Sequence, residues 1–375
     1  MRRVLFIFKA KWRSESGARG QADTTYFRTR VTDARMSLRT SEYLNTIEAM
    51  KRTFKVAAST NDWLGLPITV FRVGGKEEPA VLVTAGASGV EVAGVYAALE
   101  LLVQVDIERT TYILPSRDPT GLHEASFILS RMLGAQVEVQ SLDDIRRVLK
   151  DSGVETLIDD GELFLALLKG VGIAVGSQMD AYEVLSNLRL RLHKEELSDA
   201  LEGYRILIAS QLPQVEGVGS LNRFLTVVVQ NGEVLTYDDL ERAEIPEVAL
   251  LREFIEKQEL GLVIDLHETK CPGFYAITSD PPSSAESTIL YLVLDQVVRR
   301  GVSVADPELI KKQGLSSASE GVGYGKGACG LVDFAAPKSY ALALAAPFNA
   351  PLDERIGALM VATLSALNAF IVTSL

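Results

Sequence analysis

The feature that most constrains the fold is a strand–helix–strand pattern early in the chain. The apolar run over 80–87 predicts a buried strand, the apolar spacing over 91–105 predicts a helix, and 110–115 predicts the next strand. Two strands joined by a helix lie parallel, because the helical crossover returns the chain to the edge of the sheet where it started. The sequence therefore predicts an α/β fold with a parallel sheet.

Polar residues follow two of the predicted strands. Glu91 comes shortly after the apolar run Val81-Leu82-Val83, and His267 comes shortly after Gly261-Leu262-Val263. In open α/β sheets, ligand sites form just beyond the carboxyl ends of the strands. A carboxylate and an imidazole are the oxygen and nitrogen ligands that zinc takes in proteins. We therefore expect a site, with zinc as its candidate cofactor, where these two segments meet.

Length, composition and charge limit the class of protein. The 375 residues are enough for one large domain or two ordinary ones, and 47% hydrophobic with 23% charged residues is typical of globular proteins. The net charge of −11 argues against a nucleic-acid partner. We find no apolar run of the ~18 residues that a membrane helix needs, and we expect neither membrane association nor export. Two cysteines make no disulfide framework, so a cytoplasmic location is expected.

The chain divides into a short basic segment and one long domain. Residues 1–40 are rich in arginine and have little periodicity, which predicts a loosely ordered leader or a start codon placed too early; a targeting or binding arm is the alternative. Residues 41–375 are predicted to form a single α/β domain. Helical patterns, among them 162–169 and 181–202, predict a helical insertion in it at about 122–203.

Several segments resemble, in their order and spacing, the zinc metallocarboxypeptidase superfamily. This is the carboxypeptidase A-like fold, which includes succinylglutamate desuccinylase and aspartoacylase-type members. The resemblance covers roughly residues 50–375 outside the insertion, and it implies a mixed, mostly parallel eight-stranded sheet with helices on both faces. The segments that carry it are Ala85-Gly86-Ala87-Ser88-Gly89-Val90-Glu91, Asp118-Pro119-Thr120-Gly121, Ser220-Leu221-Asn222-Arg223, Asp265-Leu266-His267-Glu268, Gly330-Leu331-Val332-Asp333-Phe334 and Ala343-Leu344-Ala345-Ala346-Pro347.

The resemblance implies a zinc site with one ligand replaced. Glu91 and His267 match two ligand positions, while Ser88 stands at the position of the family's first histidine. A serine hydroxyl stays protonated at neutral pH and is a poor zinc ligand. Asp265 lies two residues before His267, so both side chains leave a strand on the same face, where the carboxylate can orient the imidazole as a second-shell partner.

The resemblance also implies residues that bind substrate. Asn222 and Arg223 match the pair that grips a terminal carboxylate, for which the guanidinium fork is suited. Arg205 is the candidate for the second arginine, which polarises the scissile carbonyl. Tyr324 matches the mobile tyrosine, and Asp333 lies in the segment that matches the pocket wall.

The general base of the family is also replaced. Its late-strand glutamate aligns with Ala345, and a positioned base typically contributes ~10²–10⁴-fold to the rate. The nearby acids that could substitute are Asp333 and Glu320, whereas Glu268 is expected on the opposite side of its strand. His123 is either a replacement ligand or, as we prefer, a solvated loop histidine.

These features leave three hypotheses of function. The preferred one is a metallocarboxypeptidase-like protein with a degenerate zinc site, a pseudoenzyme that binds a carboxylate-bearing peptide or small acid with little or no standard hydrolysis. The first alternative is an active, divergent zinc-dependent carboxypeptidase or amidohydrolase that uses a substitute ligand and base. The second alternative is a structural or assembly protein that interacts, or oligomerises, through the insertion.

Overall fold

The structure is a computed structural model that describes residues 40–177, 179–194, 197–211 and 222–373. These residues belong to one compact unit, Ser37–Leu375. The leader predicted for residues 1–40 lies almost wholly outside the described residues, so that expectation stays a prediction.

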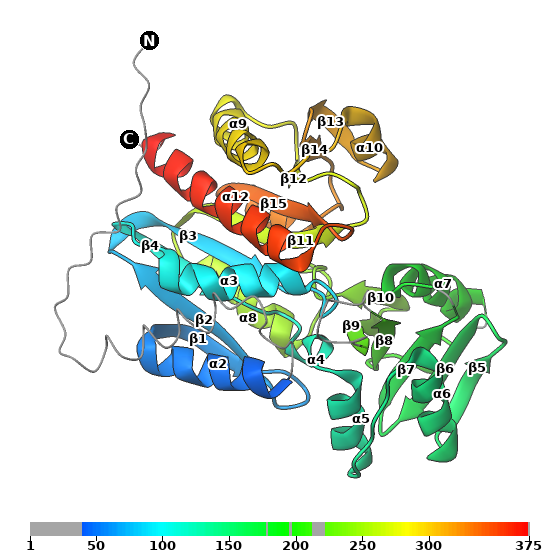
Figure 1. The fold of residues 1–375 in the computed structure, drawn as a ribbon. Helices are drawn as coiled ribbons and strands as arrows, with labels where there is room; N and C mark the ends of the chain where they lie inside the picture. Colours follow the sequence, from blue (N-terminus) through cyan, green and yellow to red (C-terminus); the bar gives the residue numbers. More distant parts are fainter. Residues whose placement is uncertain (1–39, 178, 195–196, 212–221, 374–375) are drawn as a thin grey trace. The chain divides into compact units, whose positions relative to one another are not determined.

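The largest element is a nine-stranded mixed sheet, shown with its helices in Figure 1. In their order across the sheet, the strands are β1 (Lys55–Asn61), β2 (Pro67–Gly74), β4 (Arg109–Leu114), β3 (Glu77–Ala85), β11 (Leu260–Thr269), β15 (Tyr340–Pro347), β12 (Tyr275–Thr278), β14 (Val322–Tyr324) and β13 (Ser316–Ser319). The four central strands, β4, β3, β11 and β15, run parallel to one another. Their carboxyl ends therefore share one edge.

The α/β class and the mixed sheet agree with the expectation from sequence. The expected number of strands, and the expectation that most of them run parallel, agree only approximately. The sheet has nine strands instead of eight. Outside the parallel centre, most pairs are antiparallel, including β1 with β2, β2 with β4, β15 with β12 and β14 with β13. The parallel centre is the part that the strand–helix–strand pattern predicts.

Helices cover both faces of this sheet. On one face α3 (Val92–Gln104) and α12 (Leu352–Thr373) pack against the central strands, with α9 (Ser284–Arg299) against α12. On the other face α8 (Pro246–Lys257) and α11 (Gly330–Ala335) share an apolar core with β3, β11 and β15. Two further helices, α2 (Thr40–Thr53) and α10 (Pro307–Lys312), lie beside this sheet, and the short α4 (Pro119–Leu122) follows β4 in the chain.

A second sheet follows α4 in the chain. Its strands, in order across the sheet, are β10 (Glu233–Thr236), β9 (Asn222–Gln230), β8 (Arg205–Gln211), β7 (Val171–Gly176), β6 (Leu163–Leu168) and β5 (Glu155–Asp159). One face packs on α5 (Ala125–Leu133) and α6 (Leu142–Asp151), and the other packs on α7 (Ala181–Lys194). The first turn of α6 is closed by a capping box between Ser141 and Asp144.

The insertion is therefore a mixed α/β layer and not a purely helical one. The block 122–203 contains helices α5, α6 and α7, but it also contributes three strands to the second sheet. The helix expected over 162–169 is wrong, because this segment forms β6, whose residues are nearly all buried between α6 and α7.

Helix α12 is long and apolar enough, by length and composition, to cross a membrane. The expectation from sequence that the chain has no apolar run of this length is therefore wrong for α12. Slightly more than half of its most apolar stretch, 56%, is buried in the fold against α3, α9 and β15. The core helices of globular proteins meet the same criterion, so α12 alone is weak evidence for a membrane.

Candidate functional site

Four polar side chains converge at the carboxyl edge of the parallel strands. Asp265 and His267 lie on β11, Glu91 lies at the end of the loop that follows β3, and Arg117 follows β4. Because β4, β3 and β11 are neighbours in the sheet, segments far apart in sequence meet here. This is the edge where ligand sites of α/β sheets form.

The loop between β3 and α3 brings Glu91 to this edge. Gly86 has a positive φ of +62°, a conformation that glycine adopts without strain. A Cβ on Gly89 would lie 1.8 Å from the carbonyl carbon of Gly121, so only glycine fits between this loop and α4. Glu91 occupies the N-cap position of α3 but makes no capping hydrogen bond with its side chain. The carboxylate points instead toward His267.

His267 lies between two carboxylates. Its Nδ1 is 2.9 Å from Oε2 of Glu91, and its Nε2 is 2.7 Å from Oδ2 of Asp265. Burial by itself would lower the pKa of His267, but the charges of Asp265 and Glu91 outweigh it and raise the pKa well above its ordinary value. Without a metal, the ring is therefore an imidazolium that donates at both nitrogens.

Asp265 is fully buried, and both oxygens of its carboxylate accept hydrogen bonds. Thr84 donates to Oδ1 at 2.6 Å, and the guanidinium of Arg117 donates to Oδ2 at 2.5 Å. Burial would raise the pKa of Asp265, but the charges of Arg117 and His267 hold it below the usual range. Asp265 therefore stays ionised inside the protein.

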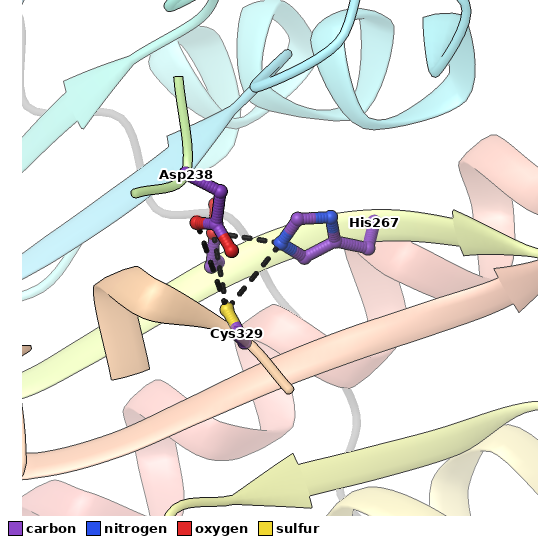
Figure 2. A group of neighbouring side chains, drawn as sticks. Asp238, His267 and Cys329 are labelled. Atoms are coloured by element: carbon purple, nitrogen blue, oxygen red, sulfur yellow. Dashed lines mark hydrogen bonds and ion pairs between the residues drawn. The ribbon is translucent and has the colours of Figure 1, made fainter. Parts of the chain in front are cut away.

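Two further side chains complete a potential metal-binding group. Asp238, after β10, contacts Arg117 at 3.2 Å, and Cys329, the N-cap residue of α11, has its Sγ 3.6 Å from Nε2 of His267. One ligand atom from each of Asp238, Asp265, His267 and Cys329 lies within 4.8 Å of all the others. Figure 2 shows a ring nitrogen of His267 directed toward Cys329 and Asp238. Burial and the charge of Asp238 raise the pKa of the Cys329 thiol to about 12.

A tyrosine from the insertion contacts both Ser88 and Glu91. Ser88 is buried in the loop before α3, and the hydroxyl of Tyr182 on α7 donates to Oε1 of Glu91 and also lies within hydrogen-bonding reach of Ser88. Burial and the charge of Glu91 raise the pKa of Tyr182 well above its ordinary value. Glu91 therefore contacts the neutral phenol of Tyr182 through one oxygen and Nδ1 of His267 through the other.

Ala345 lies where the resemblance places the general base. It pairs with His267 in the register of β15 and β11, so its methyl group is on the same face of the sheet as the imidazole. Glu268 points to the opposite face, as expected, where it accepts hydrogen bonds from the amide of Ala93 and from Arg355. It is not directed toward His267.

Arg223 and Arg205, which the resemblance implies for substrate binding, have other described partners. Arg223 is 1% exposed, and its charge interacts with Tyr96 and Glu124. Asn222 begins β9, but its side chain lies outside what the structure describes. Arg205 forms an ion pair with Glu247 at 3.0 Å and, within the described residues, makes no contact with Glu91 or His267.

Tyr324 and Asp333 also lie away from His267. Tyr324 ends β14 beside Thr278, and Oδ2 of Asp333 accepts a hydrogen bond from the amide of Gly327 at 2.6 Å. The structure brings neither into contact with the imidazole among the described residues. The expectation of a solvated His123 is wrong: its ring is 1% exposed and packs against Tyr43 and Phe127. Burial lowers the pKa of His123 to about 3.

A groove of about 470 Å³ opens beside the site. It lies between the carboxyl end of β11 and the start of α7, so Tyr182 lines both the groove and the Glu91 contact. Its cation is Lys270, whose half-exposed side chain pairs with Asp180 and with Glu183 at 3.1 Å. The lining residues are Tyr182, Glu183, Ser186, Glu268, Thr269, Lys270, Gln313 and Phe348.

Sequence patterns alone did not identify Arg117, Tyr182, Asp238 and Cys329 as site residues. Arg117 and Cys329 each directly precede a segment that carries the resemblance, so those flanks held a usable signal. Tyr182 lies on α7 in the insertion, and Asp238 follows β10 in a stretch that none of the resembling segments includes. Their sequence neighbours give no indication of a site.

Comparison with known proteins adds a likeness in fold. No protein-family model and no curated protein matches the chain. A metallo-carboxypeptidase from Burkholderia cenocepacia is similar over 89% of this chain and 69% of its own, with 12% identity and a TM-score of 0.42. A metallo-carboxypeptidase from Pseudomonas aeruginosa in complex with (2-guanidinoethylmercapto)succinic acid is similar over 88% and 69%, with 12% identity and a TM-score of 0.42. A protein from Shewanella amazonensis, provisionally described as a metallopeptidase, is similar over 87% and 91%, with 15% identity and a TM-score of 0.41.

Proposed function

We propose that this chain is a metallocarboxypeptidase-like protein that binds a carboxylate-bearing peptide or small acid and performs little or no standard hydrolysis. The observation that carries the proposal is the register between β11 and β15, which sets the methyl group of Ala345 beside His267. Hydrolysis of an amide by a metal-bound water needs a base that removes the proton of the water. A methyl group cannot accept a proton.

The contacts of Glu91 support the same conclusion. A zinc ion held by Nδ1 and Glu91 would have to take the place of the contact between Nδ1 and Oε2 of Glu91 at 2.9 Å. Glu91 itself accepts from Tyr182 on its other oxygen. A water-activating zinc at the family position would have to displace the contacts of Glu91 with His267 and with Tyr182. Ser88, at the position of the family's first histidine, is only a weak zinc ligand.

The groove next to the site is where we place the ligand. Its volume of about 470 Å³ lies within the range of small-molecule pockets, roughly 300–1,000 Å³. Lys270 supplies an exposed ammonium that can pair with a carboxylate, in competition with Asp180 and Glu183. Arg223, which the resemblance implies for this role, is buried and would reach a ligand only after a rearrangement.

The first experiment measures hydrolysis. Release of the C-terminal residue from short peptides, and of the acyl group from N-acyl amino acids, is followed with and without added zinc. We expect no release above the buffer rate in either condition. Zinc-dependent release would overturn the proposal in favour of an active divergent hydrolase.

The second experiment measures binding by isothermal titration calorimetry, with one peptide compared as free acid and as C-terminal amide. We expect only the free acid to bind. Lys270→Gln should weaken that binding by up to about fivefold, the size of an exposed ion pair of ~0.2–1 kcal/mol. The matched control is Lys257→Gln, an exposed lysine on α8 paired with Glu253, which should change nothing. Equal affinity for acid and amide would refute carboxylate recognition, and a loss in Arg223→Lys but not in Lys270→Gln would move the ligand to Arg223.

A further inference from the structure

The Nε2 side of His267 holds a donor set that differs from the ligands implied by the resemblance. We propose that His267, Cys329, Asp238 and Asp265 bind one zinc-like divalent metal ion, through Nε2, Sγ and one carboxylate oxygen each. The inference does not depend on the proposed ligand-binding function. It concerns the opposite side of the imidazole from Glu91 and Tyr182.

The distances from the sulfur to the other donor atoms fit a tetrahedral ion, while the 2.7 Å between Nε2 of His267 and Oδ2 of Asp265 would widen to about 3.3 Å around the ion. With Zn–S of ~2.3 Å and Zn–N and Zn–O of ~2.0–2.1 Å, the edges of a tetrahedron are about 3.5 Å from sulfur to nitrogen or oxygen. Sγ of Cys329 lies 3.6 Å from Nε2 of His267, 3.6 Å from Oδ2 of Asp265 and 3.9 Å from Oδ1 of Asp238. Each edge from sulfur is thus within about 0.4 Å of the ideal length.

The loops that supply two of the donors are held against each other. Gly330 follows Cys329, and its amide donates to Oδ2 of Asp238 at 2.7 Å, with a second bond from the amide of Leu331 at 3.3 Å. A Cβ on Gly330 would lie 1.9 Å from the carbonyl oxygen of Asp238, so the two segments touch through their backbones. The two donors are therefore positioned before any ion binds.

The surrounding residues provide the outer contacts that metal ligands need. Glu91 accepts from Nδ1 of His267 and leaves Nε2 for the metal, the arrangement in which a carboxylate orients a ligating histidine. Thr84 binds the second oxygen of Asp265, and Arg117 bridges Asp265 and Asp238.

This arrangement exchanges the roles of the two carboxylates. The resemblance implies Glu91 as ligand and Asp265 as the residue that orients His267, whereas here Asp265 is the ligand and Glu91 the orienting residue. Four protein donors leave no open position for water, which is typical of structural zinc sites and not of catalytic ones. The metal would then stabilise the contact of β11 with α11 and the Asp238 loop.

The test uses the full chain, stripped with a chelator and loaded with zinc or with cobalt as a spectroscopic substitute. We expect about one ion retained per chain after dialysis, a thiolate-to-cobalt charge-transfer band, and a higher midpoint of thermal unfolding with metal. Cys329→Ala should abolish the band and the retention. Cys271→Ala, which removes the other buried thiol, should keep both.

Two further variants keep the test decisive if Cys329→Ala does not fold. Asp238→Asn, at the most exposed of the four ligands, should weaken zinc binding, and Glu91→Gln should weaken it by only about 10–100-fold, as for an orienting residue. Absence of retained metal, retention without a thiolate band, or complete loss of metal in Glu91→Gln with full retention in Cys329→Ala would each overturn the proposal.

Discussion

Replacing Arg117 with methionine tests whether buried charge compensation holds the site together. Methionine keeps much of the length and apolar volume of the side chain but removes the cation. Arg117 is 97% buried, and its guanidinium donates to Asp265 at 2.5 Å and to Asp238 at 3.2 Å. Its loss leaves the fully buried carboxylate of Asp265 with His267 as its remaining cation partner among the described residues.

The size of the effect follows from these contacts. A hydrogen bond to a charged group contributes about 1.5–3 kcal/mol, and two of them give about 3–6 kcal/mol. Asp238 is partly exposed, with 21% of its side chain accessible, so water replaces part of the lost interaction there. We therefore expect a loss of about 3–5 kcal/mol in the free energy of unfolding, as for breaking one side of a buried ion pair.

Urea unfolding in the presence of a chelator measures this loss, because the chelator removes any contribution from metal. The control is Arg242→Met, since Arg242 also contacts two carboxylates, Glu233 and Asp239, but at the surface. We expect the control to lose about 0–1 kcal/mol. Similar small losses in both variants would refute the reasoning, because burial would then make no difference to the pair.

Three other changes have definite expected outcomes. Tyr182→Phe removes the hydroxyl that donates to the buried carboxylate of Glu91 and should cost about 1–3 kcal/mol in urea unfolding with a chelator; a change below about 0.5 kcal/mol would contradict the contact. Burial raises the pKa of Glu100 from 4.5 to about 7, so its contribution to stability is fully present below pH 4.5 and is lost as the pH rises through about 7. Unfolding titrations across this interval should show a smaller fall in stability in Glu100→Gln than in the parent chain, and equal slopes would contradict the shift. Gly330→Ala would place a methyl carbon 1.9 Å from the carbonyl oxygen of Asp238 and should cost about 1–3 kcal/mol or more in the same assay, whereas an unchanged midpoint would show that the two loops are not in contact.

Sequence patterns predict the part of the fold in which local periodicity and long-range packing agree. β3, α3 and β4 form as expected because their apolar spacing matches the faces they bury. β6 was mistaken for a helix because it is buried on both faces and therefore lacks alternation. A short apolar run of this kind, rich in the helix-favouring residues leucine and alanine, cannot be assigned by periodicity alone.

Some residues of the candidate site could likewise be predicted from sequence, and others could not. Glu91 and His267 could be placed together from sequence, since Glu91 follows β3, His267 lies near the carboxyl end of β11, and these parallel strands are neighbours. Asp238 and Cys329 could not, because they lie on loops whose closeness to His267 depends on how α11 packs against the sheet. A lone buried cysteine is more often a small apolar residue than a ligand, and only the structure sets its thiol beside an imidazole.

The alanine at position 345 fits the charges around it. Three carboxylates, from Glu91, Asp238 and Asp265, lie close to two cations, Arg117 and the imidazolium of His267. A glutamate in place of Ala345 would add a fourth carboxylate on the same buried face and increase the excess of negative charge. Burying a charge without a partner is costly, so the site that holds Asp238 beside Cys329 disfavours a carboxylate base next to His267. The alanine at position 345 and the donor group on the Nε2 side of His267 are therefore parts of one electrostatic arrangement.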